Sequence, residues 1–208
     1  MISQLKNIYG KPLMACGGSA INSIVAASNF GSKCQVAGKV ADDEHGNFFL
    51  KDLTNSEIQH SIVPTRSDIS TARCLVMVSK NADRTMCTYL GISNDLAEID
   101  LNLKAVESAK YLFIEGYLLS SPSALKACTT AIKVAKNNGT KVAISLSAEF
   151  IAAGFKSELE SLFELGCDLL VCNESEALAY SGENDIEQAV QHLEQTSDQI
   201  LITLGAEG

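Results

Sequence analysis

The sequence predicts an α/β fold: a three-layer α-β-α sandwich with a mainly parallel sheet and an additional β-hairpin. From residue 111 onward, short apolar segments alternate with helical segments in the order β-α-β-α-β-α-β. Short apolar strands joined by helical crossovers are typical of a parallel sheet covered on both faces. Residues 72–92 do not fit this order, because two strand-like segments flank the turn residues Asn81 and Asp83.

The part before residue 111 mixes helices with strands. A helix beginning at Ser19 has apolar residues at Ile21, Ile24 and Val25, and Gly31 is placed to end it. Residues 57–71 have no clear pattern and are expected to form strand and loop. The predicted elements are helix 19–30, strand 34–40, helix 45–56 and the hairpin strands 72–79 and 85–92.

The part after residue 111 has clearer boundaries. Ser121 is a suitable cap for the helix that Pro122 begins, and Gly139 follows its end. Residues 173–182 are expected to form a short helix at a strand end, and Ile186, Ala189 and Leu193 mark another helix. The remaining predictions are strands 111–116, 141–146, 168–172 and 199–205, and a helix over 155–165.

Length and composition limit the classes of protein. The 208 residues carry 16 Lys and Arg against 25 Asp and Glu, a net charge of −9 that argues against nucleic-acid or anionic-membrane partners. No stretch of 18 apolar residues and no apolar signal segment is present, so we expect neither membrane insertion nor secretion. Seven cysteines without a CxxC pair indicate free thiols in a reducing compartment, so the expected location is cytoplasmic.

One glycine-rich stretch stands directly before a predicted helix. Motifs of P-loop proteins, dinucleotide-binding proteins and serine hydrolases are absent from the sequence. Gly17 and Gly18 instead allow the backbone to approach a ligand closely, and Asn22 can donate to and accept from hydroxyl groups. A tight turn with a helix cap is an equally simple interpretation.

This stretch and the segment 38–46 together resemble the ribokinase-like (PfkB) carbohydrate kinase family. The shared pattern is GGSAIN, then Gly31, then GKVADDEHG, with Ala41 where the family usually has glycine. The adenosine-kinase-like and related sugar-kinase branch is most similar. The resemblance implies that Gly17, Gly18, Asn22 and Glu115 bind a sugar or nucleoside substrate. Glu115 lies at the end of a predicted strand, where open α/β sheets bind ligands, although it could also cap the next segment.

Two further motifs resemble the phosphate-handling part of the family. Asn173 and Glu176 match its Asn-x-x-Glu motif, which implies a role in holding Mg²⁺ through water and in binding phosphate. The same spacing also describes a capping box, and both interpretations can hold together. ITLGAEG resembles the nucleotide-binding segment, so the resemblance places Thr203, Gly205 and Gly208 beside ATP.

The resemblance covers 1–208 as one kinase domain that we expect to be incomplete at both ends. Residues 70–93 resemble the family's lid-associated strands. The family's first strands precede the paired glycines, and its general base and anion hole lie in a GAGD motif that this sequence lacks. We therefore expect no catalytic base within the chain, loss of turnover and retention of weak ligand binding.

The function expected from the resemblance is ATP- and Mg²⁺-dependent phosphorylation of a sugar or nucleoside hydroxyl. A homodimer is one expected assembly. The alternative is a non-catalytic α/β binding or interaction protein derived from the same fold, which the absent GAGD motif favours. An α/β oxidoreductase is a further alternative, disfavoured by the missing glycine fingerprint.

Overall fold

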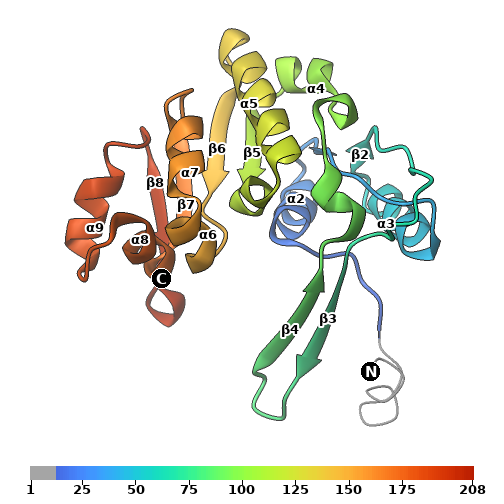
Figure 1. The fold of residues 1–208 in the computed structure, drawn as a ribbon, viewed down its shortest axis with the longest axis horizontal. Coiled ribbons are helices and arrows are strands. Elements are labelled where there is room, and N and C mark those ends of the chain that lie inside the picture. Colours follow the sequence, from blue (N-terminus) through green and yellow to red (C-terminus); the bar gives the residue numbers. More distant parts are fainter. Residues whose placement is uncertain (1–12) are drawn as a thin grey trace.

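The computed structural model describes residues 13–208. The prediction that the chain has no secretory signal concerns mainly residues 1–12, which lie outside the described residues. Its larger sheet consists of β5 (Tyr111–Glu115), β6 (Lys141–Ser145), β7 (Leu169–Asn173) and β8 (Ile200–Thr203), hydrogen-bonded in this order (Figure 1). All neighbouring pairs are parallel, which confirms the predicted sheet.

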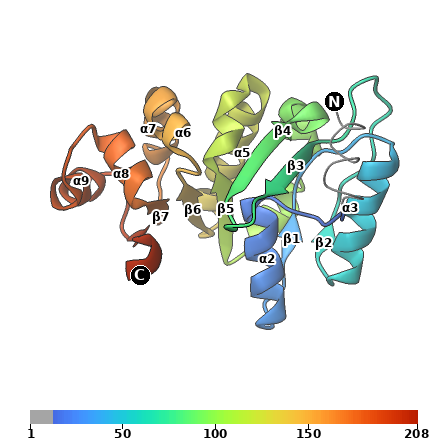
Figure 2. The ribbon, with the colours of Figure 1, turned by 90° about the horizontal axis from the view of Figure 1, so that it is seen from below.

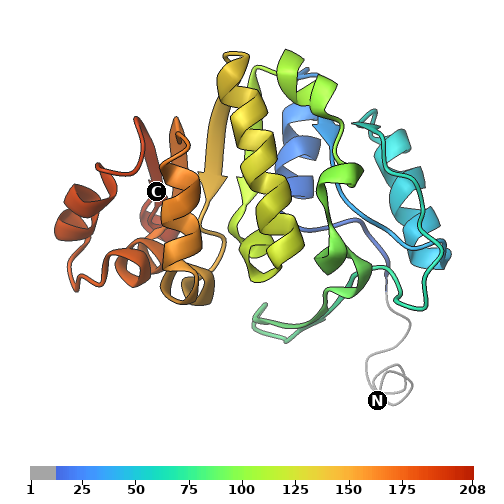
Figure 3. The same ribbon diagram turned by 45° about the horizontal axis from the view of Figure 1, so that its top comes forward.

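Most helices of the second half lie on one face of this sheet (Figures 2 and 3). The longest begins as predicted, with Pro122 at its first turn and the Ser121 hydroxyl accepting a hydrogen bond from the Ala124 N–H at 3.5 Å. The short helix 149–154 was not predicted, since six residues give too little periodicity. The helices are α5 (Pro122–Asn137), α6 (Glu149–Gly154), α7 (Lys156–Phe163), α8 (Glu174–Ser181) and α9 (Ile186–Leu193).

The main core fills the space between this sheet face and these helices. Ile144 and Leu170 from the strands are fully buried against Ile132 and Leu159 from the helices. Burying a side chain of this kind contributes about 1.5–3 kcal/mol, so this layer dominates the stability of the fold. Among residues 13–208, no helix is long and apolar enough to cross a membrane.

The first half forms a smaller unit around a second core. It contains α2 (Ser19–Asn29), β1 (Gln35–Val36), α3 (Glu44–Asn55) and β2 (Gln59–His60), and β1 pairs with β2 in parallel. The predicted strand 34–40 is shorter than expected, because its regular pairing with β2 extends over two residues only, Gln35 and Val36. The core residues of this unit are Ile21, Val36, Val40, Leu53, Ile58 and Ile62.

The segment 38–46 is a structural junction. The Asp43 carboxylate caps α3 by accepting from the Gly46 N–H at 2.8 Å, and it accepts from the Thr71 N–H at 2.9 Å and hydroxyl at 2.7 Å. Burial alone would raise the pKa of Asp43, but these hydrogen bonds outweigh it and hold the pKa below its usual range. Asp43 therefore ties the start of α3 to the base of the hairpin.

The predicted hairpin is present as β3 (Arg73–Val78) and β4 (Arg84–Tyr89), an antiparallel pair. It projects from the side of the molecule toward which the strands of the larger sheet point (Figure 1). Five further short helices were not expected from the sequence, because each is too short to show a helical period. Three of them connect the hairpin to β5, and the other two follow β5 and β8. They are η1 (Gly91–Asp95), η2 (Glu98–Asp100), α4 (Leu103–Ser108), η3 (Gly116–Ser120) and η4 (Gly205–Glu207).

Candidate functional site

The carboxyl ends of the parallel strands bring together residues from three separate motifs. Glu115 ends β5 and is paired in register with Ser145, while Asn173 ends β7 and is paired with Thr203 of β8. Ligands of open α/β sheets bind beyond the carboxyl ends of the strands. The structure thus brings the candidate residues from β5, β7 and β8 to one edge.

Glu115 joins this edge to the helix of the paired glycines. Its Oε1 accepts a hydrogen bond from the Ser19 hydroxyl and another from the Ala20 N–H, the latter at 2.7 Å. Both donors belong to the first turn of α2, where the partial positive charge of the helix stabilises a carboxylate. Oε2 takes no hydrogen bond from the part of the chain that the structure describes, so it is available as an acceptor.

The paired glycines and Asn22 lie at the same rim. Gly18 precedes α2 with φ of 107°, a value that favours glycine, and the Asn22 N–H closes the first turn on the Gly18 carbonyl at 3.0 Å. Gly17, Gly18 and Asn22 are exposed. Since Glu115 contacts Ser19 and Ala20 of this turn, the backbone of Asn22 lies near the same end of β5, and contact of Asn22 with a substrate stays a prediction.

Asn173 and Glu176 form a complete capping box at the start of α8. The Asn173 Oδ1 accepts from the Glu176 N–H at 2.8 Å, and the Glu176 carboxylate accepts from the Asn173 backbone N–H at 3.1 Å and Nδ2 at 3.0 Å. Burial and the nearby negative charge of Glu149 raise the pKa of the Glu176 carboxyl. The hydrogen bond from the Asn173 backbone N–H lowers it, but the net shift is upward. The capping interpretation of this motif is therefore confirmed.

The same pair fits Mg²⁺ only through water. Each Glu176 oxygen already accepts one hydrogen bond from Asn173, and the residues described contain no group of three or more His, Cys, Asp or Glu side chains that could hold a metal. Mg²⁺ keeps several waters and needs few direct carboxylates. A water-mediated contact with Asn173 and Glu176 is compatible with this donor set, and a direct protein cage is not.

An exposed aromatic pair at this edge was missed by the sequence analysis. Tyr117 and Phe150 are 41% and 62% exposed, with ring centroids 6.2 Å apart. Burial, then the negative charges of Glu176 and Glu115, raise the pKa of Tyr117 above its ordinary value. The available signal was its position two residues after Glu115 at a strand end.

The segment after β8 forms a short exposed turn. Gly205 and Gly208 both have positive φ, and the Leu204 N–H donates to the Gly208 carbonyl. Thr203, Gly205 and Gly208 are exposed beside the Asn173 end of the sheet edge. Their proposed contact with a nucleotide stays a prediction.

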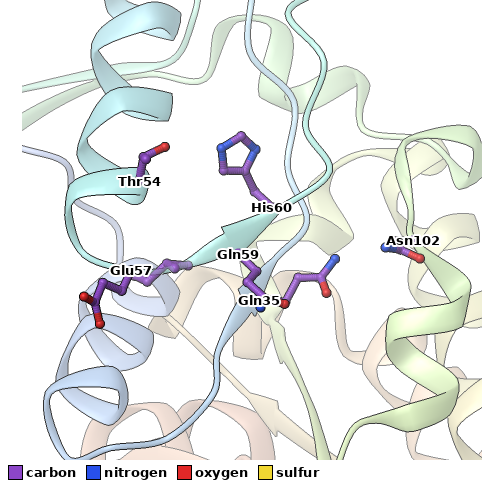
Figure 4. A pocket seen from close by; sticks show the side chains of 7 residues that line it. Gln35, Thr54, Glu57, Gln59, His60 and Asn102 are labelled. Atoms are coloured by element: carbon purple, nitrogen blue, oxygen red, sulfur yellow. The ribbon is translucent and has the colours of Figure 1, made fainter.

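A separate hollow lies at the amino end of the small sheet, away from this edge. It has a volume of about 560 Å³ and includes Gln35 and Gln59, the first residues of β1 and β2 (Figure 4). His60 also lines it, and the Nδ1 atom of His60 is buried without a hydrogen-bond partner among the described residues. None of the residues predicted to bind substrate, nucleotide or metal contributes to the hollow.

The structure is an α/β fold with a parallel sheet. Its candidate ligand-binding residues, in the turn of the paired glycines, at Glu115 and in the capped Asn-x-x-Glu turn, lie at the carboxyl ends of the strands. A family model described as pfkB family carbohydrate kinase matches residues 9–208. The chain belongs to this family, which confirms the resemblance identified from its motifs.

Individual relatives are kinases of nucleosides and sugars. Adenosine kinase of Schizosaccharomyces pombe is 31% identical over 188 residues, covering 85% of this chain and 53% of that protein. The crystal structure of adenosine kinase from Sinorhizobium meliloti is 31% identical and has a TM-score of 0.93, covering 100% of this chain and 64% of that one. A probable sugar kinase from Rhizobium etli is 28% identical with a TM-score of 0.92, covering 100% and 63%. The chain therefore spans between half and two thirds of these relatives.

Proposed function

We propose that this chain forms the acceptor- and nucleotide-binding part of an ATP- and Mg²⁺-dependent kinase that phosphorylates a sugar or nucleoside hydroxyl. The observation that carries the proposal is the alignment of Glu115, Asn173 and Thr203 along one sheet edge. Glu115 would accept hydrogen bonds from acceptor hydroxyls at one end of this edge. Asn173 and Thr203 would lie beside the phosphates at the other end.

The aromatic pair favours a nucleoside over a simple sugar as the acceptor. Tyr117 follows Glu115 by two residues, and its ring and that of Phe150 are both partly exposed; flat bases stack on aromatic rings with about 1–3 kcal/mol per base. A simple sugar has no aromatic base, so it cannot stack in this way. The similarity to adenosine kinases of S. pombe and S. meliloti supports the same choice.

The side chains of the site contribute binding and orientation. Glu115 is fixed by two hydrogen bonds to α2, so its free oxygen is held in place before a ligand arrives. Mg²⁺, when bound, would neutralise phosphate charge, and Asn173 and Glu176 would hold its water ligands. The hairpin would act as a lid that limits access of water to the acceptor.

Calorimetry with adenosine, ribose and fructose, together with an ATP-consumption assay, tests the proposal. We expect adenosine to bind more tightly than ribose or fructose, and ATP turnover to stay at background because the sequence lacks the family's GAGD motif. Turnover near 1–100 s⁻¹, roughly the range of kinases, would show that a base lies within this chain. Absence of binding to all three ligands and to ATP would favour the non-catalytic interaction protein.

Replacing Glu176 by glutamine separates its two roles. Glutamine keeps one acceptor oxygen for the Asn173 backbone N–H but loses the second acceptor, so we expect the free energy of unfolding of Glu176→Gln to fall by about 1 kcal/mol. We expect the Mg²⁺-dependent part of ATP affinity, measured by titration with and without the metal, to fall severalfold because the carboxylate charge is lost. Glu174→Gln, in the same turn but outside the capping box, is the matched control. Unchanged Mg²⁺ dependence in Glu176→Gln would reduce this residue to a structural cap.

A further inference from the structure

Ser147 has a backbone conformation that is unfavourable for a residue with a side chain. Its φ is 68°, and the Ala148 N–H donates across it to the Leu146 carbonyl at 2.8 Å. A hydrogen bond that spans three residues with a positive central φ forms a γ-turn of the rare and strained kind. Strain of this sort persists where the surroundings fix it, and it occurs preferentially at functional sites. The turn follows β6 directly, between the ends of β5 and β7.

The Ser147 side chain connects this turn to the end of β5. Its hydroxyl oxygen accepts a hydrogen bond from the Gly116 N–H at 2.8 Å and donates one to the Ser145 carbonyl at 3.3 Å. Gly116 is buried, and a Cβ at this position would lie 2.8 Å from the carbonyl oxygens of Ser145 and Leu146. The ends of β5 and β6 are thus held together by close backbone packing and by one hydroxyl group.

Each of the two connected segments carries one ring of the exposed aromatic pair. Gly116 begins η3, whose second residue is Tyr117. Ala148 is the cap residue of α6, whose second residue is Phe150, and α6 packs against η3. The hydrogen bond between Ser147 and Gly116 therefore joins the two segments just before the rings, and it sets how the rings face each other.

Glu115 is held by different contacts. Its carboxylate accepts hydrogen bonds from the Ser19 hydroxyl and the Ala20 N–H of α2, and neither bond involves the Ser147 hydroxyl. Loss of that hydroxyl would leave both bonds in place. A free sugar that binds through Glu115 would then keep its contact, whereas a ligand that also stacks a base on the two rings would lose part of its binding.

We propose that Ser147 is a positioning residue that gives the acceptor site its preference for a nucleoside over a free sugar. Its hydroxyl keeps Tyr117 and Phe150 at the spacing that a stacked base requires, and it acts through the Gly116 N–H without touching the ligand. The inference rests on the proposed function, because it assigns a role within the same acceptor site. The strained turn is the observation that carries it, since a turn with ordinary φ would not point this hydroxyl at β5.

Ser147→Ala removes the hydroxyl and keeps the Cβ. Calorimetry with adenosine and with ribose measures the preference, and the nuclear Overhauser effect between the ring protons of Tyr117 and Phe150 reports their contact. We expect this effect to be lost, adenosine binding to weaken by about tenfold and ribose binding to stay unchanged. Ser108→Ala, the same substitution at the exposed end of α4 before β5 begins, is the matched control and should change none of the three.

Ser147→Gly is the second variant, for the case that the alanine variant does not fold. Glycine adopts a positive φ without strain but also lacks the hydroxyl, so we expect the same loss of preference in a folded chain. Unchanged adenosine affinity in either folded variant would overturn the proposal. An equal loss of adenosine and ribose binding would also overturn it, because it would indicate disruption of the whole site. Absence of adenosine binding to the unmodified chain would instead refute the proposed function, and the ring contact would then decide whether Ser147 positions the pair.

Discussion

Gly46→Ala is expected to destabilise the first half of the chain by about 3 kcal/mol or more, since overpacking of a buried position costs roughly this amount. A Cβ at this position would lie 2.1 Å from the Ala41 carbonyl oxygen and 3.0 Å from the Thr71 hydroxyl oxygen. The better helix propensity of alanine, worth about 1 kcal/mol, cannot offset a clash with backbone. Urea unfolding followed by circular dichroism measures the change.

Asn47→Ala is the matched control for this substitution. Asn47 is the next residue of α3 and is exposed, so its replacement should change the unfolding free energy by less than about 0.5 kcal/mol. The Gly46 variant should also loosen the hairpin, because Asp43 bonds to both Gly46 and Thr71. Equal stability of the two variants would contradict the close approach of α3 to Ala41.

Glu115→Ala is expected to weaken adenosine binding roughly 10- to 100-fold, the effect of losing one or two hydrogen bonds to a charged group. The substitution removes the free Oε2 acceptor and also releases the first turn of α2 from β5. Both losses act on the same ligand, since Asn22 and the paired glycines belong to that turn. Calorimetric titration with adenosine measures the dissociation constant.

The control for this variant is Glu107→Ala, which removes the same charge from an exposed position of α4. Its affinity for adenosine should equal that of the unmodified chain. Thermal unfolding of both variants shows whether each remains folded at the titration temperature. An unchanged dissociation constant in folded Glu115→Ala would remove Glu115 from the acceptor site.

The second half of the fold could be predicted almost in full, because its local signals agree with its packing. Ser121 and Pro122 begin α5 where predicted, and each apolar segment from residue 111 onward became a parallel strand. Prediction failed for α4 and α6, which are six residues long and held by contacts distant in sequence. A period of 3.6 cannot be recognised in fewer than two turns.

The candidate site residues could be predicted where they belong to a recognisable sequence motif. Glu115, Asn173 and Thr203 could be identified because each ends a strand, and the parallel order of the strands then brings them to one edge. The hydrogen bonds from Ser19 and Ala20 to Glu115 could not be predicted, because these two residues are about a hundred positions away from Glu115 in the sequence. Tyr117 and Phe150 were missed because aromatic residues are often buried, and the sequence does not show that these two are exposed.

The hairpin is tied to the rest of the molecule at its base, through Thr71, which lies two residues before its first strand. Thr71 is bound by Asp43, and across from it the Ile92 N–H donates to the Ser70 carbonyl at 3.0 Å. Strands of six residues reach about 20 Å beyond this point. A rotation of about 10° at this base would therefore carry the tip through about 3.5 Å, slightly more than the diameter of one water molecule.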